Sequence, residues 1–144
     1  MNIYIVSDHA GVELKNLLIQ SHPECIDLSP LNTIADDYPD FARTLALKLE
    51  SEPDSLGVAI CGSGQGICIA INKFNNIRAG LITQVEQVNN LKQHNNANVM
   101  CLSNQFTNRN ELNEIFDSFI SISFSNETRH IRRINKIKII NNIL

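Results

Sequence analysis

The chain has 144 residues, a length typical of one domain, with 43% hydrophobic and 19% charged residues, a balance that excludes a disordered chain. Its formal net charge of −3 argues against a general nucleic-acid-binding protein, and no apolar stretch reaches the about 20 residues that span a bilayer. We therefore expect a single domain over residues 1–144 that binds neither nucleic acid nor a membrane.

Short apolar runs alternate with segments of helical periodicity along the whole chain. The expected strands are residues 3–6, 25–28, 57–61, 78–82 and 98–102. The expected helices begin near Val12, Pro39, Ile67, Val85 and Leu112, and a last helix follows Asn126. Continuous apolar strands are typical of a parallel sheet that helices cover on both faces. The pattern predicts an α/β fold, a three-layer α/β/α Rossmann-like sandwich with a five-stranded parallel sheet and a C-terminal helix.

In such a fold, ligands bind outside the carboxyl ends of the strands. We expect three polar turns at that edge, namely the turns after Val6, after Cys61 and before Asn98. Asp37 is expected to cap the helix that Pro39 begins. The side chains of the three turns are the first candidates for a functional site.

The sequence Cys61-Gly62-Ser63-Gly64-Gln65-Gly66 follows the third strand. Glycines at this spacing let the backbone aim several N–H groups at one point, and the next helix adds its positive dipole end. Such a turn can hold a phosphate or a developing oxyanion, whereas a dinucleotide site would need a different glycine spacing. A thiolate at Cys61 would act as a base or nucleophile, although a small buried apolar residue would also suit this position.

Two further stretches combine histidine with other polar groups. Asp8 and His9 follow the first strand, where a ligand would lie, although helix capping by Asp8 with an exposed His9 is the alternative. His94 precedes the last strand and is a natural proton shuttle, while Asn95 can bind hydroxyl groups. A plain polar loop in an Asn-rich chain is the alternative for this second stretch.

Arg129 and Arg133 share one face of the last helix, because they are four residues apart. Two guanidinium groups on one face can bind a phosphate, although a basic helix is more often only solvated. His22 and His130 lack a comparable setting, and we expect both at the surface.

The four cysteines, Cys25, Cys61, Cys68 and Cys101, form neither a C-x-x-C pair nor a zinc-like spacing with histidine. The first residues lack the basic segment and the long apolar run of a secretion signal. Together these observations indicate free thiols in a reducing, cytoplasmic setting.

These stretches, taken in order, resemble ribose-5-phosphate isomerase type B over nearly the whole chain. The resemblance is carried by Asp8-His9, Asp37-Tyr38-Pro39, the glycine turn 61–66, Asn72-Lys73-Phe74, Arg78-Ala79, His94-Asn95-x-x-Asn98 and Arg129-His130-x-x-Arg133. It implies an aldose–ketose isomerase that interconverts ribose 5-phosphate and ribulose 5-phosphate in pentose metabolism. It also implies that no metal or cofactor is needed, and that a homodimer or homotetramer shares active sites between subunits.

The resemblance implies a role for each candidate residue. Cys61 would move the proton between C2 and C1, Ser63 would tune the thiol, and His94 would open the furanose ring with Asn95 placing the reacting oxygens. Backbone N–H groups would stabilise the enediolate at Gly62, Gly64 and Gly66. The substrate would be bound by Asp8 at a hydroxyl group, by Tyr38 at the pocket wall, and at the phosphate by His9, Arg129 and Arg133.

One position departs from the family pattern. Many members have an arginine in the loop after the fifth strand that contacts the phosphate, whereas Gln105 stands there in this chain. Either Arg109 replaces that guanidinium, or fewer charges hold the phosphate. The loss of one charge-assisted contact would weaken binding by about 1.5–3 kcal/mol.

Several other functions compete with this reading. Related isomerases act on galactose 6-phosphate or allose 6-phosphate, but the galactose enzymes divide their motifs between two kinds of subunit. Here all the motifs share one chain, which favours the ribose type, while the depth of the pocket would decide about allose 6-phosphate. A non-catalytic sugar-phosphate-binding protein is disfavoured because thiol and imidazole are both present. A flavodoxin-like mononucleotide binder is disfavoured because the chain has no Trp and two Tyr.

Overall fold

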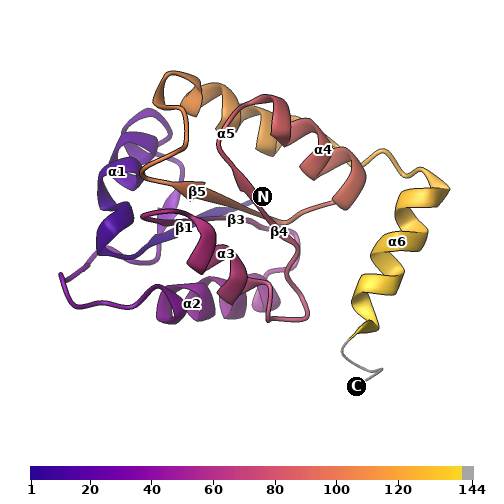
Figure 1. Ribbon diagram of the computed structural model, residues 1–144, viewed down its shortest axis with the longest axis horizontal. Helices are drawn as coiled ribbons and strands as arrows, with labels where there is room; N and C mark the ends of the chain where they lie inside the picture. Colours follow the sequence, from indigo (N-terminus) through magenta and orange to yellow (C-terminus); the bar gives the residue numbers. More distant parts are fainter. Residues whose placement is uncertain (141–144) are drawn as a thin grey trace.

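A five-stranded parallel sheet with helices on both faces forms the body of the computed structural model, which describes residues 1–140 (Figure 1). The strands are β1 (Ile3–Ser7), β2 (Ile26–Asp27), β3 (Leu56–Cys61), β4 (Ala79–Ile82) and β5 (Val99–Ser103). The helices are α1 (Val12–Ser21), α2 (Tyr38–Ser51), α3 (Gln65–Ile71), α4 (Glu86–Asn95), α5 (Leu112–Ser121) and α6 (Thr128–Lys138), with short 3-10 helices η1 (His9–Gly11) and η2 (Arg109–Glu111). The strand order is β2-β1-β3-β5-β4, which confirms the predicted α/β fold.

Two apolar layers hold the helices to the sheet. The layer under α1, α4 and α5 contains Ile5, Phe116 and Phe119, and the layer under α2 and α3 contains Val6 and Leu45. Successive strand residues point to opposite faces, so Ile5 and Val6 belong to different layers. The three central strands, β1, β3 and β5, are buried on both sides, which explains why they read as apolar runs.

The boundaries differ slightly from the predicted ones. The helix expected from Ile67 begins at Gln65, because it starts directly after Gly64, whose left-handed backbone forms the N-cap. Asp37 does occupy the N-cap position of α2 and Pro39 its first turn, as predicted. The Asp37 side chain, however, makes no capping hydrogen bond.

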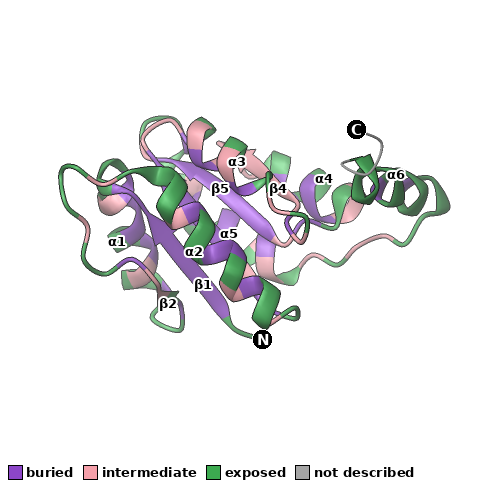
Figure 2. Ribbon diagram, turned by 90° about the horizontal axis from the view of Figure 1, so that it is seen from below, coloured by how far each residue is buried: buried purple, intermediate pink, exposed green. Residues whose placement is uncertain are grey.

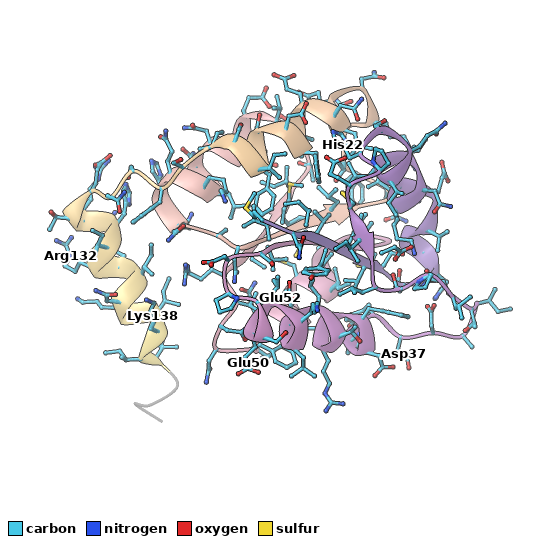
Figure 3. All side chains as sticks on the ribbon, turned by 180° about the vertical axis from the view of Figure 1, so that it is seen from behind. His22, Asp37, Glu50, Glu52, Arg132 and Lys138 are labelled. Carbon is cyan, nitrogen blue, oxygen red and sulfur yellow. The ribbon has the colours of Figure 1, made fainter. Side chains whose placement is uncertain are left out.

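The prediction of surface positions for His22 and His130 is wrong. His22 is 8% exposed and lies between α1 and α5, where its ring packs 4.1 Å from that of Phe116 (Figure 3). His130 is 5% exposed and stacks on His94. Both rings are covered by a helix distant in sequence, and local periodicity does not reveal such packing.

Helix α6 stands apart from the sheet and packs mainly against α4 (Figures 1 and 2). Most of its residues are exposed, and so are four isoleucines in and just after it, Ile131, Ile137, Ile139 and Ile140. This apolar surface has little to pack against within residues 1–140.

Within residues 1–140, no helix combines the length and the apolarity that crossing a membrane requires.

Removal of the Phe116 side chain tests the core under α5. Phe116→Ala leaves a cavity where a fully buried ring was, so we expect the free energy of unfolding to fall by about 3–5 kcal/mol. Phe106→Ala is the matched control, because Phe106 is 63% exposed, and it should change stability by no more than about 0.5 kcal/mol. Urea unfolding followed by circular dichroism measures both, and equal losses would contradict this core.

Candidate functional site

The glycine turn lies at the carboxyl edge of the sheet, between β3 and α3. Cys61 ends β3, is 4% exposed and pairs in register with Ser103 of β5. The Gly62 carbonyl oxygen accepts a hydrogen bond from Ser103 Oγ at 2.9 Å. Gly64 has a φ of +74°, and a Cβ at that position would lie 2.9 Å from the carbonyl oxygen of Leu102. Only glycine therefore fits there, and the tight turn holds Cys61 at the strand end.

Two further predicted residues lie beside this turn. The half-buried Ser63 accepts a hydrogen bond from the Gln65 N–H at 3.3 Å. Tyr38, the first residue of α2, lies against Gly66 so closely that a Cβ on Gly66 would be 2.7 Å from its ring. The structure thus brings Tyr38, Ser63 and Cys61 to one edge of the sheet, as predicted.

Asp8 and His9 follow β1 and lie next to the glycine turn. The Asp8 N–H donates to the Ile60 carbonyl oxygen at 3.3 Å, and Asp8 Oδ1 accepts from the Gly11 N–H at 3.1 Å, which caps η1. Burial raises the pKa of the Asp8 carboxyl above its usual value. Asp8 therefore combines capping, the alternative role considered for it, with the predicted place at the ligand edge.

Asp36 belongs to this edge but does not stand out in the sequence. Its Oδ1 accepts from the His9 N–H at 2.8 Å and lies 2.7 Å from His9 Nδ1, and this side-chain hydrogen bond raises the pKa of His9. Burial favours the neutral form of Asp36, but hydrogen bonds from Asn32, His9 and Thr33 outweigh burial and lower its pKa to about 2. Asp36 precedes the Asp37-Tyr38-Pro39 motif, and that proximity is the only sequence signal for it.

His94 and Asn95 lie at the opposite edge of the sheet, contrary to the prediction. They end α4, and the chain then enters β5 at Val99, so they lie near the amino end of that strand. A turn that precedes a parallel strand lies at the edge opposite to one that follows it. The length of a five-residue strand, about 15 Å, therefore separates the level of His94 from that of Cys61.

The end of α4 is fixed by Arg78. Its Nε donates to the Asn95 carbonyl oxygen at 2.9 Å and its Nη2 to that of Asn96 at 2.8 Å. Asn98 Oδ1 accepts from the Arg78 N–H at 2.9 Å. Of the residues that carry the resemblance, Arg78 and Asn98 thus anchor the chain that directly follows His94 at the end of α4.

Helix α6 brings further polar residues to His94. The rings of His94 and His130 stack with centroids 4.3 Å apart and an angle of 14° between their planes. The pKa of His130 is lowered, mainly by burial and to a smaller extent by the charge of His94. Arg129 and Arg133 are exposed on the same helix, and Arg129 Nε lies 3.0 Å from a Glu127 carboxylate oxygen.

Arg109 lies near the start of α1, and its guanidinium is already engaged. Its Nη1 donates to the Asn104 carbonyl oxygen at 2.7 Å, and its Nη2 lies 3.1 Å from Oε1 of Glu13. Gln105 is exposed and donates its backbone N–H to the Gly62 carbonyl oxygen at 3.0 Å. The Arg109 guanidinium, one of the two alternatives considered for the missing family arginine, thus has a carboxylate partner within the chain.

The predicted site residues therefore form two groups at opposite edges of the sheet. The thiol half-site consists of Asp8, His9, Tyr38, Cys61, Gly62, Ser63, Gly64 and Gly66. The imidazole half-site consists of His94, Asn95, Arg129 and Arg133, with His130 stacked on His94. The first group offers a thiol at the start of the glycine turn, and the second offers an imidazole on α4 and two guanidinium groups on α6, the helix that packs against α4.

The chain is similar to sugar-phosphate isomerases over nearly its whole length. A family model described as Ribose/Galactose Isomerase matches residues 3–137. A probable ribose-5-phosphate isomerase B of Mycoplasma pneumoniae is 43% identical over 140 residues, which cover 94% of this chain and 91% of that protein. The crystal structure of ribose-5-phosphate isomerase B of Mycoplasma genitalium with bound ribulose-5-phosphate has a TM-score of 0.90 at 38% identity and covers 99% of this chain and 97% of its own. The type B enzyme of Trypanosoma cruzi has a TM-score of 0.92 at 32% identity over the full length of both chains.

Substitution of Gly64 tests the shape of the glycine turn. Gly64→Ala places a Cβ on a residue with a left-handed backbone, which costs about 1–2 kcal/mol. The Cβ would also approach the Leu102 carbonyl, so we expect the free energy of unfolding to fall by more than that amount. Gly62→Ala is the matched control, because the nearest atom to its Cβ would be that of Ala10 at 3.4 Å. Thermal unfolding compares the two, and an equally stable Gly64 variant would refute the strained geometry.

Proposed function

The chain belongs to the ribose/galactose isomerase family, and we propose that it interconverts ribose 5-phosphate and ribulose 5-phosphate. The observation that carries the proposal is the match over almost the full chain to an isomerase B structure that holds ribulose-5-phosphate. The thiol, the imidazole and the arginine pair that such chemistry requires are present together in one sequence. We further propose that residues 1–144 form one isomerase domain and that it works in the cytoplasm, where a catalytic thiol stays reduced.

In the proposed reaction, His94 first moves the proton that opens the furanose ring. The Cys61 thiolate then removes the proton from C2 and returns it to C1, while a hydroxyl proton passes from O2 to O1. Asn95 places these oxygens, and Ser63 tunes the thiol. The enediolate between the two steps would be stabilised by the backbone N–H groups of the glycine turn, because its charge appears only during the reaction.

The remaining half-site residues bind the substrate in this proposal. Asp8 accepts a hydrogen bond from a sugar hydroxyl, and Tyr38 forms part of the pocket wall. His9, Arg129 and Arg133 bind the phosphate, since guanidinium and imidazolium groups make strong charge-assisted hydrogen bonds to it.

A second copy of the chain would complete the site. The two half-sites lie about 15 Å apart along the strand direction, which is too far for one sugar phosphate to contact both within one chain. A two-fold dimer would place the imidazole half-site of each copy over the thiol half-site of the other, generating two complete sites. The exposed isoleucines of α6 support this arrangement, because contact with a second copy would bury them. A tetramer built from such dimers would contain the same sites.

A hexose phosphate isomerase is the second candidate, because the matching family description names galactose as well as ribose. Allose 6-phosphate and galactose 6-phosphate are one carbon longer, so the depth of the completed pocket would select between the substrates.

Turnover of ribose 5-phosphate by the purified chain is the direct test, followed as ribulose 5-phosphate formation without added metal. Cys61→Ala should lower kcat by about 100- to 10,000-fold, because it removes the base. Cys68→Ala is the matched control, since Cys68 is a free, half-buried thiol on α3 with no role in the proposed reaction, and it should retain activity. An active Cys61 variant would refute the base, and turnover of only six-carbon phosphates would favour the second candidate.

Mixing two inactive variants tests the shared site. Cys61→Ala and His94→Ala, unfolded and refolded together, should form mixed dimers in which one of the two sites has all its residues. Random pairing then restores about one quarter of the wild-type activity. In the control, a double variant with both Cys61→Ala and His94→Ala is refolded with the His94→Ala variant. Every site of these mixed dimers lacks His94, so no activity should return. No regain with the first pair, despite mixed dimers, would show that each site lies within one chain.

A further inference from the structure

His9 is held at two points by one carboxylate. Asp36 Oδ1 lies 2.8 Å from the His9 backbone nitrogen and 2.7 Å from the ring Nδ1. Since a carboxylate only accepts, the proton sits on Nδ1 and the ring has one preferred orientation. The other ring nitrogen, Nε2, is left for an external partner, and 44% of the His9 side chain is exposed while that of Asp36 is 12% exposed.

Asp36 is itself fixed to the sheet. Its Oδ2 accepts from Asn32 Nδ2 and from the Thr33 N–H, both at 3.0 Å. Asn32 Nδ2 also donates to the carbonyl oxygen of Ser7 at 2.7 Å, and Ser7 is the last residue of β1. The loop before α2 therefore positions Asp36 relative to the strand that ends beside Asp8 and His9.

A buried lysine of α1 makes hydrogen bonds to this loop. Lys15 of α1 is 2% exposed, and its Nζ donates to Asn32 Oδ1 at 2.9 Å and to the Ser29 carbonyl oxygen at 2.6 Å. It also lies 3.1 Å from a carboxylate oxygen of Asp27, which balances its charge. Three elements, β1, β2 and α1, thus hold the loop that places one imidazole.

The charges around His9 favour its cationic form. The carboxylates that face it are those of Asp36 and Asp8, and both raise its pKa. The guanidinium of Arg109 is bound by Glu13 and by the Asn104 carbonyl, and Gln105 is neutral. A phosphate at the thiol half-site would therefore meet His9 as the cation that the loop presents.

We propose that Asp36 is a positioning residue for substrate binding, which holds the His9 ring in one orientation and in its cationic form with Nε2 facing the phosphate of the sugar. This inference rests on the proposed function, because it takes the sugar phosphate as the ligand of His9. Asp36 touches His9 and not the substrate, so its effect belongs to binding more than to the proton transfer at carbon.

The dependence on pH follows from the sign of the interaction. The hydrogen bond from Asp36 raises the pKa of His9, so the imidazolium is present below that pKa and is lost as the pH rises through it. Without the Asp36 charge, the same loss occurs at lower pH. The KM for a sugar phosphate should therefore begin to rise at lower pH in a variant without the Asp36 charge than in the wild type.

Asp36→Asn tests the inference, because it keeps an oxygen for the His9 N–H but removes the charge. We expect the midpoint of the His9 titration, followed by NMR of the ring protons, to fall, and KM near pH 8 to rise about 10-fold with kcat changed by less than about 2-fold. Near pH 6 the difference in KM should be small. Glu50→Gln is the matched control, because it makes the same charge change at an exposed position of α2 and should alter neither quantity (Figure 3).

A double-mutant cycle with His9→Gln separates positioning from general loop support. If Asp36 acts through His9, Asp36→Asn has no further effect on KM once His9 is replaced. A full 10-fold effect in that background, or an unchanged His9 titration in the single variant, would overturn the inference.

A wild type that turns over no ribose 5-phosphate would refute the proposed function. Binding of inorganic phosphate would then test the role of Asp36 separately. Phosphate that shifts the His9 resonances of the wild type, and binds about 10-fold more weakly to Asp36→Asn near pH 8, would support it. Equal binding to both proteins, or no binding to the wild type, would overturn it.

Discussion

Burial of both faces of the sheet decides where this chain can hold polar chemistry. Every residue of β1 and of β5 is buried, so a charged group in the middle of either strand would lose its hydration without a partner. Reactive side chains therefore lie just beyond the strand ends, where backbone donors and loops are available. Asp8 after β1 and Cys61 at the end of β3 follow this rule at one edge, and His94 before β5 follows it at the other.

The two edges differ in the charges that they offer. At the thiol half-site, carboxylates surround a single histidine, and the guanidinium of Arg109 is balanced by Glu13. The imidazole half-site offers Arg129 and Arg133 on an exposed helix. In the proposed site each half supplies one proton-transfer group, Cys61 or His94, and part of the phosphate contacts, so the separation of the halves along the strands is what makes a second copy necessary.

Much of the fold and of the thiol half-site was predictable from the sequence. Apolar runs gave the five strands, and the glycine spacing after Cys61 indicated a turn that the left-handed Gly64 now explains. Asp36 was not predictable, because its partner His9 lies 27 residues earlier and no spacing rule joins them. The burial of His22 and His130 was missed for the same reason, since each ring is covered by a helix distant in sequence.

The sequence by itself determined the order of elements, the parallel sheet and the identity of the reactive side chains, because periodicity and motif spacing are local properties. Only the tertiary structure decided which reactive groups meet. It placed His94 at the amino edge and Cys61 at the carboxyl edge, because β5 has to run parallel to β3. It also set α6 apart from the sheet and fixed His9 to Asp36 through a loop whose conformation depends on a buried lysine. Contacts between distant segments arise from packing, which no local pattern encodes.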